Sequence, residues 1–214
     1  MYTQGCIRNA ELMPTIYPGW KMVVYMDGSV PSDVVQSLIK LNVEIRKPWC
    51  SNGMFWRFGI SDDPKAEAFI IRDTDSRINQ REAGAVKEWL DSRKGAHVLA
   101  DHPAHSPVMG GGLWGARHGV IKGMTGVIQQ YGPAKLENDR KVTYNSDQIF
   151  LRDFVWPLIE KDVLIHDLCH HRLRLGAVPF PSKFGDDRFV GEVFDAQDRP
   201  RSFDADMRLN WQEP

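Results

Sequence analysis

Short apolar runs alternate with segments of helical spacing along this chain. Runs of four to eight apolar residues are typical of buried strands, whereas apolar residues three or four apart indicate a helix with one apolar face. Strands that alternate with helices favour a mostly parallel central sheet flanked by helices on both faces, so the sequence predicts an α/β domain. The predicted helices are at 3–15, 32–41, 79–93, 119–131 and 145–151, and the predicted strands at 20–27, 43–46, 68–71, 96–100 and 163–167.

The predicted domain covers residues 1–194, after which the chain turns polar. Residues 195–214 are expected to form a polar tail or linker, which could join a further domain of a longer polypeptide. The aromatic cluster at 53–60 is expected to lie in the core. Three consecutive glycines at 110–112 would let the backbone approach a ligand closely, although a flexible loop is the alternative.

Two carboxylates follow the apolar run that ends at Ile71. Asp73 and Asp75 are separated by one residue, so on an extended chain they would point to the same side. Ligands of open α/β sheets bind at the carboxyl ends of the strands. Two like charges so close require a cation or a shared proton, and a divalent cation would also leave positions for phosphate. The alternative is an ordinary loop in which Asp73 caps the following helix.

Charge and cysteine content narrow the classes of function. The 27 basic and 28 acidic side chains leave a net charge of −1, which argues against a general nucleic-acid binder with its usual basic excess. Three widely spaced cysteines without a CxxC pair suggest reduced thiols. No apolar run has the length of a membrane span, and no signal-peptide pattern opens the chain, so a soluble cytoplasmic protein is expected.

Residues 69–89 (FIIRDTDSRINQREAGAVKEW) resemble the metal-binding segment of GT-A-fold glycosyltransferases. These enzymes use an Asp-x-Asp motif to hold Mn²⁺ or Mg²⁺ on the diphosphate of a nucleotide sugar. Other stretches, across roughly residues 2–194, are similar to a branch found among bacterial and large algal-virus glycan-building enzymes. The resemblance implies a single GT-A-like, Rossmann-related domain, whose usual opening strand would precede the helix at 3–15 and is missing from this sequence.

The resemblance also implies roles for particular residues. Asp147 and Gln148 match the Asp-Gln of retaining enzymes, in which the Asp binds sugar hydroxyls and the Gln lies beside the anomeric carbon. Asp73 and Asp75 would bind the metal together with His166, which follows a strand, and His170 is the reserve ligand. The alternatives are ordinary helix-start chemistry for Asp147 and a merely buried or exposed role for each histidine.

Further residues are candidates for the two substrates. The donor would contact Arg72, Arg77, Asp101, Gly111 and Gly112, and the acceptor would lie near His102 and Trp114. Arginine suits bidentate contacts with phosphate, but Arg77 and the neighbouring Arg81 could equally pair with acidic side chains. Asp101 could be an ordinary turn residue before His102.

The leading hypothesis is therefore a metal-dependent glycosyltransferase that moves a hexose from a nucleotide diphosphate sugar to a glycan, glycoprotein or other hydroxyl acceptor. A UDP-sugar is the favoured donor and a GDP-sugar the second choice, by resemblance alone. A phosphatase or phosphotransferase of the haloacid dehalogenase type, with Asp73 as nucleophile, is the second hypothesis. In that class Thr or Val normally stands where this chain has Arg77. The third is a non-catalytic nucleotide-sugar or glycan-binding module.

Overall fold

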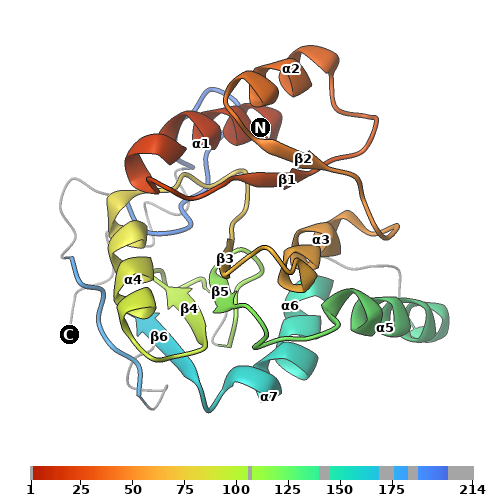
Figure 1. The fold of residues 1–214 in the computed structure, drawn as a ribbon, viewed down its shortest axis with the longest axis vertical. Coiled ribbons are helices and arrows are strands. Elements are labelled where there is room, and N and C mark those ends of the chain that lie inside the picture. Colours follow the sequence, from red (N-terminus) through yellow and green to blue (C-terminus); the bar gives the residue numbers. More distant parts are fainter. Residues whose placement is uncertain (1, 106–107, 140–144, 169–175, 183–187, 202–214) are drawn as a thin grey trace.

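The computed structural model of the chain describes residues 2–105, 108–139, 145–168, 176–182 and 188–201 (Figure 1). It has the predicted α/β architecture, and each predicted element has a counterpart. The strand predicted at 20–27 covers only Val23–Tyr25, and the helix predicted at 119–131 covers Met124–Asp139 instead. No helix in these ranges is long and apolar enough to cross a membrane. The elements are α1 (Tyr2–Ile16), β1 (Val23–Tyr25), α2 (Ser32–Lys40), β2 (Glu44–Arg46), α3 (Gly53–Trp56), the 3₁₀ helix η1 (Arg57–Asp62), β3 (Ala68–Ile71), α4 (Gln80–Asp91), β4 (Ala96–Ala100), β5 (Trp114–Arg117), α5 (Met124–Asp139), α6 (Ser146–Phe150), the π-helical turn η2 (Leu151–Val155), α7 (Trp156–Ile159) and β6 (Val163–Asp167).

The main sheet has four strands in the order β3-β5-β4-β6 and is mixed. Strand β5 pairs antiparallel with both β3 and β4, and only β4 and β6 are parallel. The prediction of a mostly parallel sheet is therefore wrong. The prediction failed because it did not include β5. The four residues of this strand (WGAR) contain a glycine and form no apolar run, so the sequence pattern did not indicate a strand there.

A second, two-stranded sheet lies apart from the first. Strands β1 and β2 are parallel, and neither pairs with β3 in the described chain. In Figure 1 this small sheet and the helices α1 and α2 form the upper part of the molecule, above β3. Strands β1 and β3 are consequently edge strands of two separate sheets.

Helices cover both faces of the main sheet, as predicted. Side chains alternate along β3 because successive residues point to opposite faces. Phe69 and Ile71 face the aromatic core formed with α3, η1, α6 and η2, whereas Ala68 and Ile70 face an apolar cluster with α1 and α4. The aromatic run at 53–60 supplies Phe55 and Phe58 to the core, which confirms that prediction.

Two helix ends have unusual features. Helix α1 contains Pro14 and continues through it to Ile16. Pro31 occupies the cap position before α2, and no side chain caps that helix.

Candidate functional site

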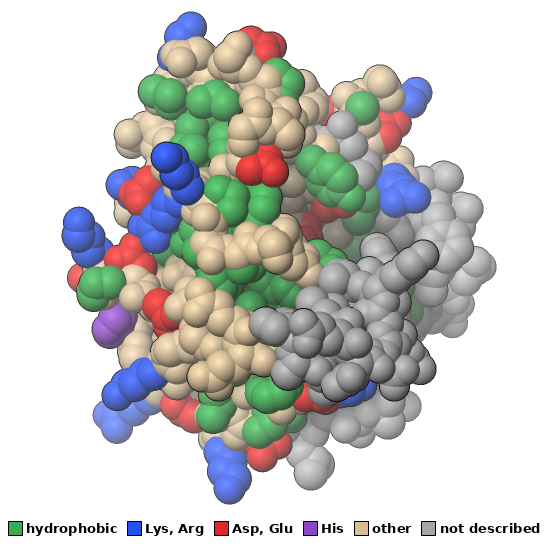
Figure 2. Space-filling model, turned by 90° about the vertical axis from the view of Figure 1, so that its right-hand side faces the viewer, with side chains coloured by type: hydrophobic (Ala, Val, Ile, Leu, Met, Phe, Trp, Pro, Cys, Tyr) green, Lys and Arg blue, Asp and Glu red, His purple; other side chains and the backbone are tan. Residues whose placement is uncertain are grey.

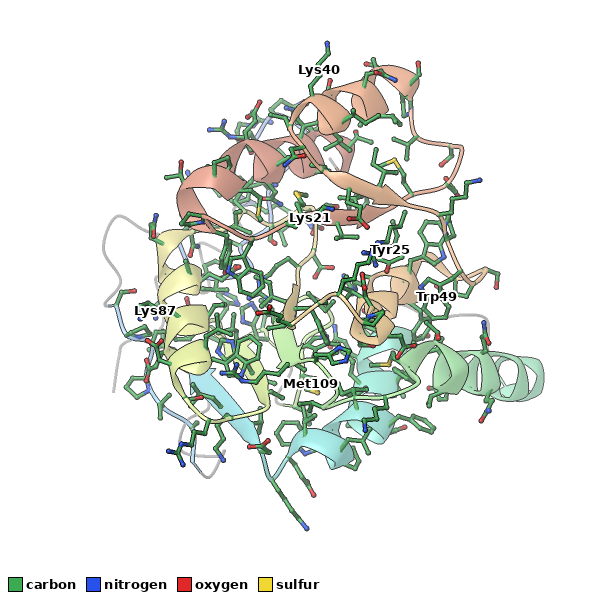
Figure 3. All side chains as sticks on the ribbon, in the orientation of Figure 1. Lys21, Tyr25, Lys40, Trp49, Lys87 and Met109 are labelled. Atoms are coloured by element: carbon green, nitrogen blue, oxygen red, sulfur yellow. The ribbon has the colours of Figure 1, made fainter. Side chains whose placement is uncertain are left out.

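A cleft of about 1540 Å³ lies between the upper sheet and the main sheet. The loop after β3 contributes Asp73 and Asp75, and the start of α6 contributes Asp147 and Gln148. With Arg72 and Gly111, six predicted site residues line this cavity. Lys21 and Tyr25 line the cleft from the other side, and in Figure 3 they lie below β1 in the view, toward β3 and α3.

The two predicted metal carboxylates lie in a turn rather than on an extended strand. The backbone N–H and the hydroxyl of Ser76 both donate to the carbonyl oxygen of Asp73, at 3.4 and 2.9 Å. Asp73 and Asp75 therefore do not point to one side through strand alternation, as they would on an extended chain. Both side chains nevertheless line the cleft, because the turn occurs where β3 leaves the sheet.

Arg57 joins the two halves of the site. Its Nη2 donates to Asp147 Oδ2 at 2.6 Å, and its Nη1 donates to Asp73 Oδ1. The Asp147 side chain is only 9% exposed, so this ion pair offsets the cost of burying its charge. The sequence analysis missed Arg57, although a single basic residue within an apolar aromatic run (GMFWRFG) was an available signal.

Gly111 and Gly112 lie so close to other residues that no side chain fits at either position. A Cβ atom at Gly111 would collide with the Asp147 carboxylate and lie 2.6 Å from Arg57 Nη2. A Cβ atom at Gly112 would collide with the Asp73 carboxylate and lie 2.7 Å from the Asp73 backbone nitrogen. Glycine at both positions lets the loop pack directly against the carboxylates, which are thereby held in place.

Asp75 has an unusual electrostatic position. Burial raises the pKa of its carboxyl group above the ordinary value, and the charge of Asp73 raises that pKa further, while Arg57 and Arg201 oppose the shift. Within the part of the chain that the structure describes, no basic side chain forms a salt bridge with Asp75. A half-buried carboxylate in this position would be stabilised by an added cation.

Gln148 is oriented by its neighbour Asn145. The Gln148 side-chain amide donates to Asn145 Oδ1 at 3.2 Å, which leaves its carbonyl oxygen without a hydrogen bond to any described residue. Asn145 itself has the left-handed backbone conformation, with φ of 75°, and both residues line the cleft. The amide oxygen of Gln148 is therefore available to a bound molecule.

Arg72 lies in the cleft wall, but its charge is already compensated. Its Nε is 2.7 Å from Glu82 Oε1, and the Tyr17 hydroxyl donates to the same oxygen at 2.6 Å. The Glu82 side chain is 2% exposed. Arg72 therefore connects the end of β3 to α4 and α1, and the structure gives no support to the predicted contact with a donor.

Arg77 and Asp101 are also structural in this fold, and neither lines the cleft. Asp101 forms a buried two-point ion pair with Arg81, at 2.7 and 2.8 Å. Arg77 donates to Asp198 at 2.7 Å, within the segment predicted to be a tail, and its guanidinium lies over the Phe194 ring. Both arginines thus took the alternative role of pairing with acidic side chains.

His166 does not lie beside Asp73 and Asp75, the two predicted metal carboxylates. It is fully buried on β6, where Nδ1 is 2.9 Å from His97 Nε2 and Nε2 is 3.2 Å from Glu88 Oε2. Strands β3, β4 and β6 do end at the same edge of the sheet, as predicted. However, β5 and β4 lie between β3 and β6, which separates them by about 14 Å at the usual strand spacing. His170, the reserve ligand, lies outside the described residues.

The predicted acceptor residues are buried elsewhere. His102 is 2% exposed and stacks on Phe189 at a ring distance of 4.4 Å. Trp114 is fully buried in β5 and packs against Phe58 and Phe69. Neither residue lines the cleft, so the structure does not support a contact between either side chain and an acceptor.

Comparison with known proteins finds similarity to solved structures and not to families or curated sequences. No protein-family model and no curated protein matches the chain. The fold is similar to that in the crystal structure of a glycosyltransferase involved in the glycosylation of the major capsid of PBCV-1, with a TM-score of 0.47 and 13% sequence identity. The similarity covers 83% of this chain and 85% of that chain. A likeness of this degree does not define an activity.

Charged side chains of both signs are spread over the visible surface. On the face shown in Figure 2, basic and acidic side chains are interspersed, and no broad patch of one sign is present among the described residues. This distribution agrees with the net charge of −1.

Proposed function

We propose that this protein is a metal-dependent glycosyltransferase that transfers a hexose from a nucleotide diphosphate sugar to a hydroxyl acceptor, with retention of anomeric configuration. One observation carries the proposal. Asp73, from the loop after β3, and Asp147, from α6, meet on the same guanidinium of Arg57 inside a single cleft. That these two residues, far apart in the sequence, share one partner supports the proposal that the metal and the sugar bind side by side.

The residues around Asp73 and Asp75 suit a divalent cation. Two carboxylates share a turn, and Asp75 forms no salt bridge with the described basic residues, so hard oxygen ligands are available. Among the described residues there is no group of three His, Cys, Asp or Glu side chains that could hold a metal, so phosphate and water oxygens would complete the coordination. When bound, Mn²⁺ or Mg²⁺ would act as a Lewis acid toward the leaving diphosphate.

The size of the cleft suits a donor together with part of an acceptor. Its volume of about 1540 Å³ exceeds the roughly 300–1,000 Å³ that is usual for pockets of small ligands. The preference for a uridine over a guanosine diphosphate sugar rests on the sequence resemblance described above. A glycan or glycoprotein hydroxyl is the proposed acceptor on the same basis.

The chain's own residues have distinct roles in this proposal. Asp147, held by Arg57, would accept hydrogen bonds from sugar hydroxyls. The free amide oxygen of Gln148 would lie beside the anomeric carbon and stabilise its developing positive charge. The bond from that carbon to the diphosphate oxygen breaks, a bond to the acceptor oxygen forms, and the acceptor proton leaves with the diphosphate.

Turnover with a panel of nucleotide sugars tests the proposal. Wild-type protein with Mn²⁺ should release UDP from a UDP-hexose in the presence of a glycan acceptor, and free UDP should compete better than free GDP. Asp73→Asn and Asp75→Asn should abolish this release. Asp91→Asn is the matched control, because Asp91 is exposed at the end of α4 and, among the described residues, forms a salt bridge with Lys87 alone.

Each alternative has its own result in these assays. Donor binding without turnover for any acceptor would favour a binding module. Release of phosphate from simple phosphate esters, lost in Asp73→Asn, would favour the haloacid dehalogenase type. No metal-dependent binding of any nucleotide sugar would refute the proposed function.

A further inference from the structure

Both carboxylate oxygens of Asp73 are in contact with other parts of the chain. Oδ2 faces Gly112, where an added Cβ atom would collide with it. Oδ1 accepts a hydrogen bond from Arg57 Nη1. Carboxylates bind divalent cations through their oxygens. A cation on Asp73 therefore needs the place beside Oδ1 that the Arg57 guanidinium takes in this structure.

The guanidinium of Arg57 and a divalent cation cannot share that place. Both are positively charged, and two cations on one carboxylate oxygen would be only about 4 Å apart, where their repulsion is strong. The loop at Gly112 packs against Asp73 and leaves its carboxylate little room to turn away. Binding of a cation to Asp73 therefore requires Arg57 Nη1 to leave it.

The other half of the Arg57 guanidinium has a separate anchor. Its Nη2 donates to Asp147 Oδ2 at 2.6 Å, and its planar end lies over the Phe58 ring at 5.4 Å. The Asp147 side chain is 9% exposed, whereas that of Asp73 is 46% exposed, so ions from solution reach the Asp73 end first. Arg57 Nε forms no hydrogen bond with a described residue. Loss of the contact with Asp73 would thus leave Arg57 attached to Asp147, with Nη1 free.

A free Nη1 in this cleft is a suitable group for a phosphate oxygen. Arginine forms strong, charge-assisted hydrogen bonds with phosphate. Arg57, Asp73 and Asp75 all line the cleft, so a diphosphate held by a cation on the two aspartates would lie near Nη1. The contact would also restore a negative partner to a charged group that is largely buried.

We propose that Arg57 is the counter-ion of Asp73 until a divalent cation binds, and that Nη1 then passes from Asp73 to a diphosphate oxygen of the donor while Nη2 stays on Asp147. The cation and the donor would bind in that order, because the contact between Arg57 and the donor forms only after Asp73 has been released. This inference rests on the proposed function, from which it takes the cation and the diphosphate.

Substitution of Arg57 should change the two binding steps in opposite directions. Binding of Mn²⁺ alone is measured from the electron paramagnetic resonance signal of the free ion, and binding of UDP at saturating Mn²⁺ by calorimetry. Arg57→Met removes the competing cation, so it should tighten Mn²⁺ binding roughly tenfold. It also removes the phosphate contact, so it should weaken UDP binding roughly tenfold or more. A residue that only supported the fold would weaken both steps when it is replaced.

Two further variants separate this exchange from other effects. Arg57→Gln has no charge but keeps an amide that can donate to Asp147, so it should show the same two changes even if Arg57→Met does not fold. Lys65→Met is the matched control for net charge. Lys65 lines the same cleft and, within the described chain, forms no salt bridge with either aspartate. Its loss should change the Mn²⁺ affinity by less than about threefold at 0.15 M salt, because distant charges are screened.

Each contrary result has a distinct meaning. If the wild-type protein binds UDP only with Mn²⁺, but both Arg57 variants bind Mn²⁺ no more tightly than it does, the inference is wrong and the proposed function stands. Unchanged UDP binding in these variants, or equal tightening of Mn²⁺ binding in Lys65→Met, would also overturn the inference. Absence of Mn²⁺-dependent UDP binding in the wild-type protein would refute the proposed function and this inference together.

Discussion

Replacing Asp75 with Asn should have opposite effects on the metal-free and the metal-bound protein. Asn has nearly the shape of Asp but no charge. Burial and the neighbouring Asp73 both raise the pKa of Asp75, which means that the fold disfavours its charged form. At neutral pH the substitution should therefore stabilise the metal-free protein, although it removes a proposed metal ligand.

The size of the stabilisation follows from the local charges. Coulomb's law gives about 3 kcal/mol for two unit charges about 6 Å apart at an effective dielectric constant of about 20. Asp73 is 46% exposed and already paired with Arg57, so most of that repulsion is screened, and about 1 kcal/mol remains. For a chain of this size, about 1 kcal/mol corresponds to a rise of about 2–4 °C in Tm.

Thermal unfolding with and without Mn²⁺ and UDP measures both effects. Ligand at 100 times its Kd should stabilise the wild-type protein by about 2.7 kcal/mol, whereas Asp75→Asn should gain almost nothing, so the order of the two Tm values should reverse. Asp73→Asn is the comparison variant. It should also lose the ligand effect, but without stabilisation, because Asp73 has a cationic partner in Arg57.

The stability difference between Asp75→Asn and the wild-type protein should depend on pH. A group whose pKa is raised in the folded state holds its proton more tightly there, so the cost of charged Asp75 is present above that pKa and fades as the pH falls through it. The advantage of Asn should be greatest at neutral pH and absent below 3.8, the ordinary value. A lower Tm for metal-free Asp75→Asn at pH 7, or an unchanged response to Mn²⁺ and UDP, would refute the reasoning.

Three further substitutions test other parts of the site. Arg57→Met should lower the free energy of unfolding by about 2 kcal/mol, measured by denaturant unfolding, because it leaves the buried Asp147 carboxylate without its ion-pair partner. Arg57→Lys keeps the positive charge and should lose less stability. Equal losses in the two variants would contradict the role of the ion pair. Gly112→Ala should destabilise the protein by about 1–3 kcal/mol through its collision with Asp73, whereas Gly126→Ala, with open space around it in α5, should be neutral or slightly stabilising. His166→Ala should lower the free energy of unfolding by about 2–4 kcal/mol. It should not change the Mn²⁺ concentration needed for donor binding. A higher Mn²⁺ requirement in this variant would support the prediction that His166 is a metal ligand.

The sequence by itself determined most of the local structure and the position of the Asp-x-Asp motif at residues 73–75. Apolar runs located β3, β4 and β6, because buried strands must be apolar, and helical spacing located α1, α2 and α4. The Asp-x-Asp after β3 became a candidate site because two carboxylates follow an apolar run, and the Asp-Gln at the start of α6 became one through its resemblance to the motif of retaining enzymes. These features are encoded within a few consecutive residues, so they can be read without knowledge of long-range contacts.

Only the tertiary structure decided which of the candidate residues share a cavity. Asp101, His102 and His166 follow or occupy strands as expected, and Trp114 lies on β5, which was not predicted. Whether a side chain faces a cleft or a packed layer depends on strand order. The insertion of β5 between β3 and β4 moved β6 away from Asp73. Arg57 was not predicted as a site residue, yet it binds two predicted ones. It donates to Asp73 and Asp147, which are distant in the sequence and meet only when the chain folds.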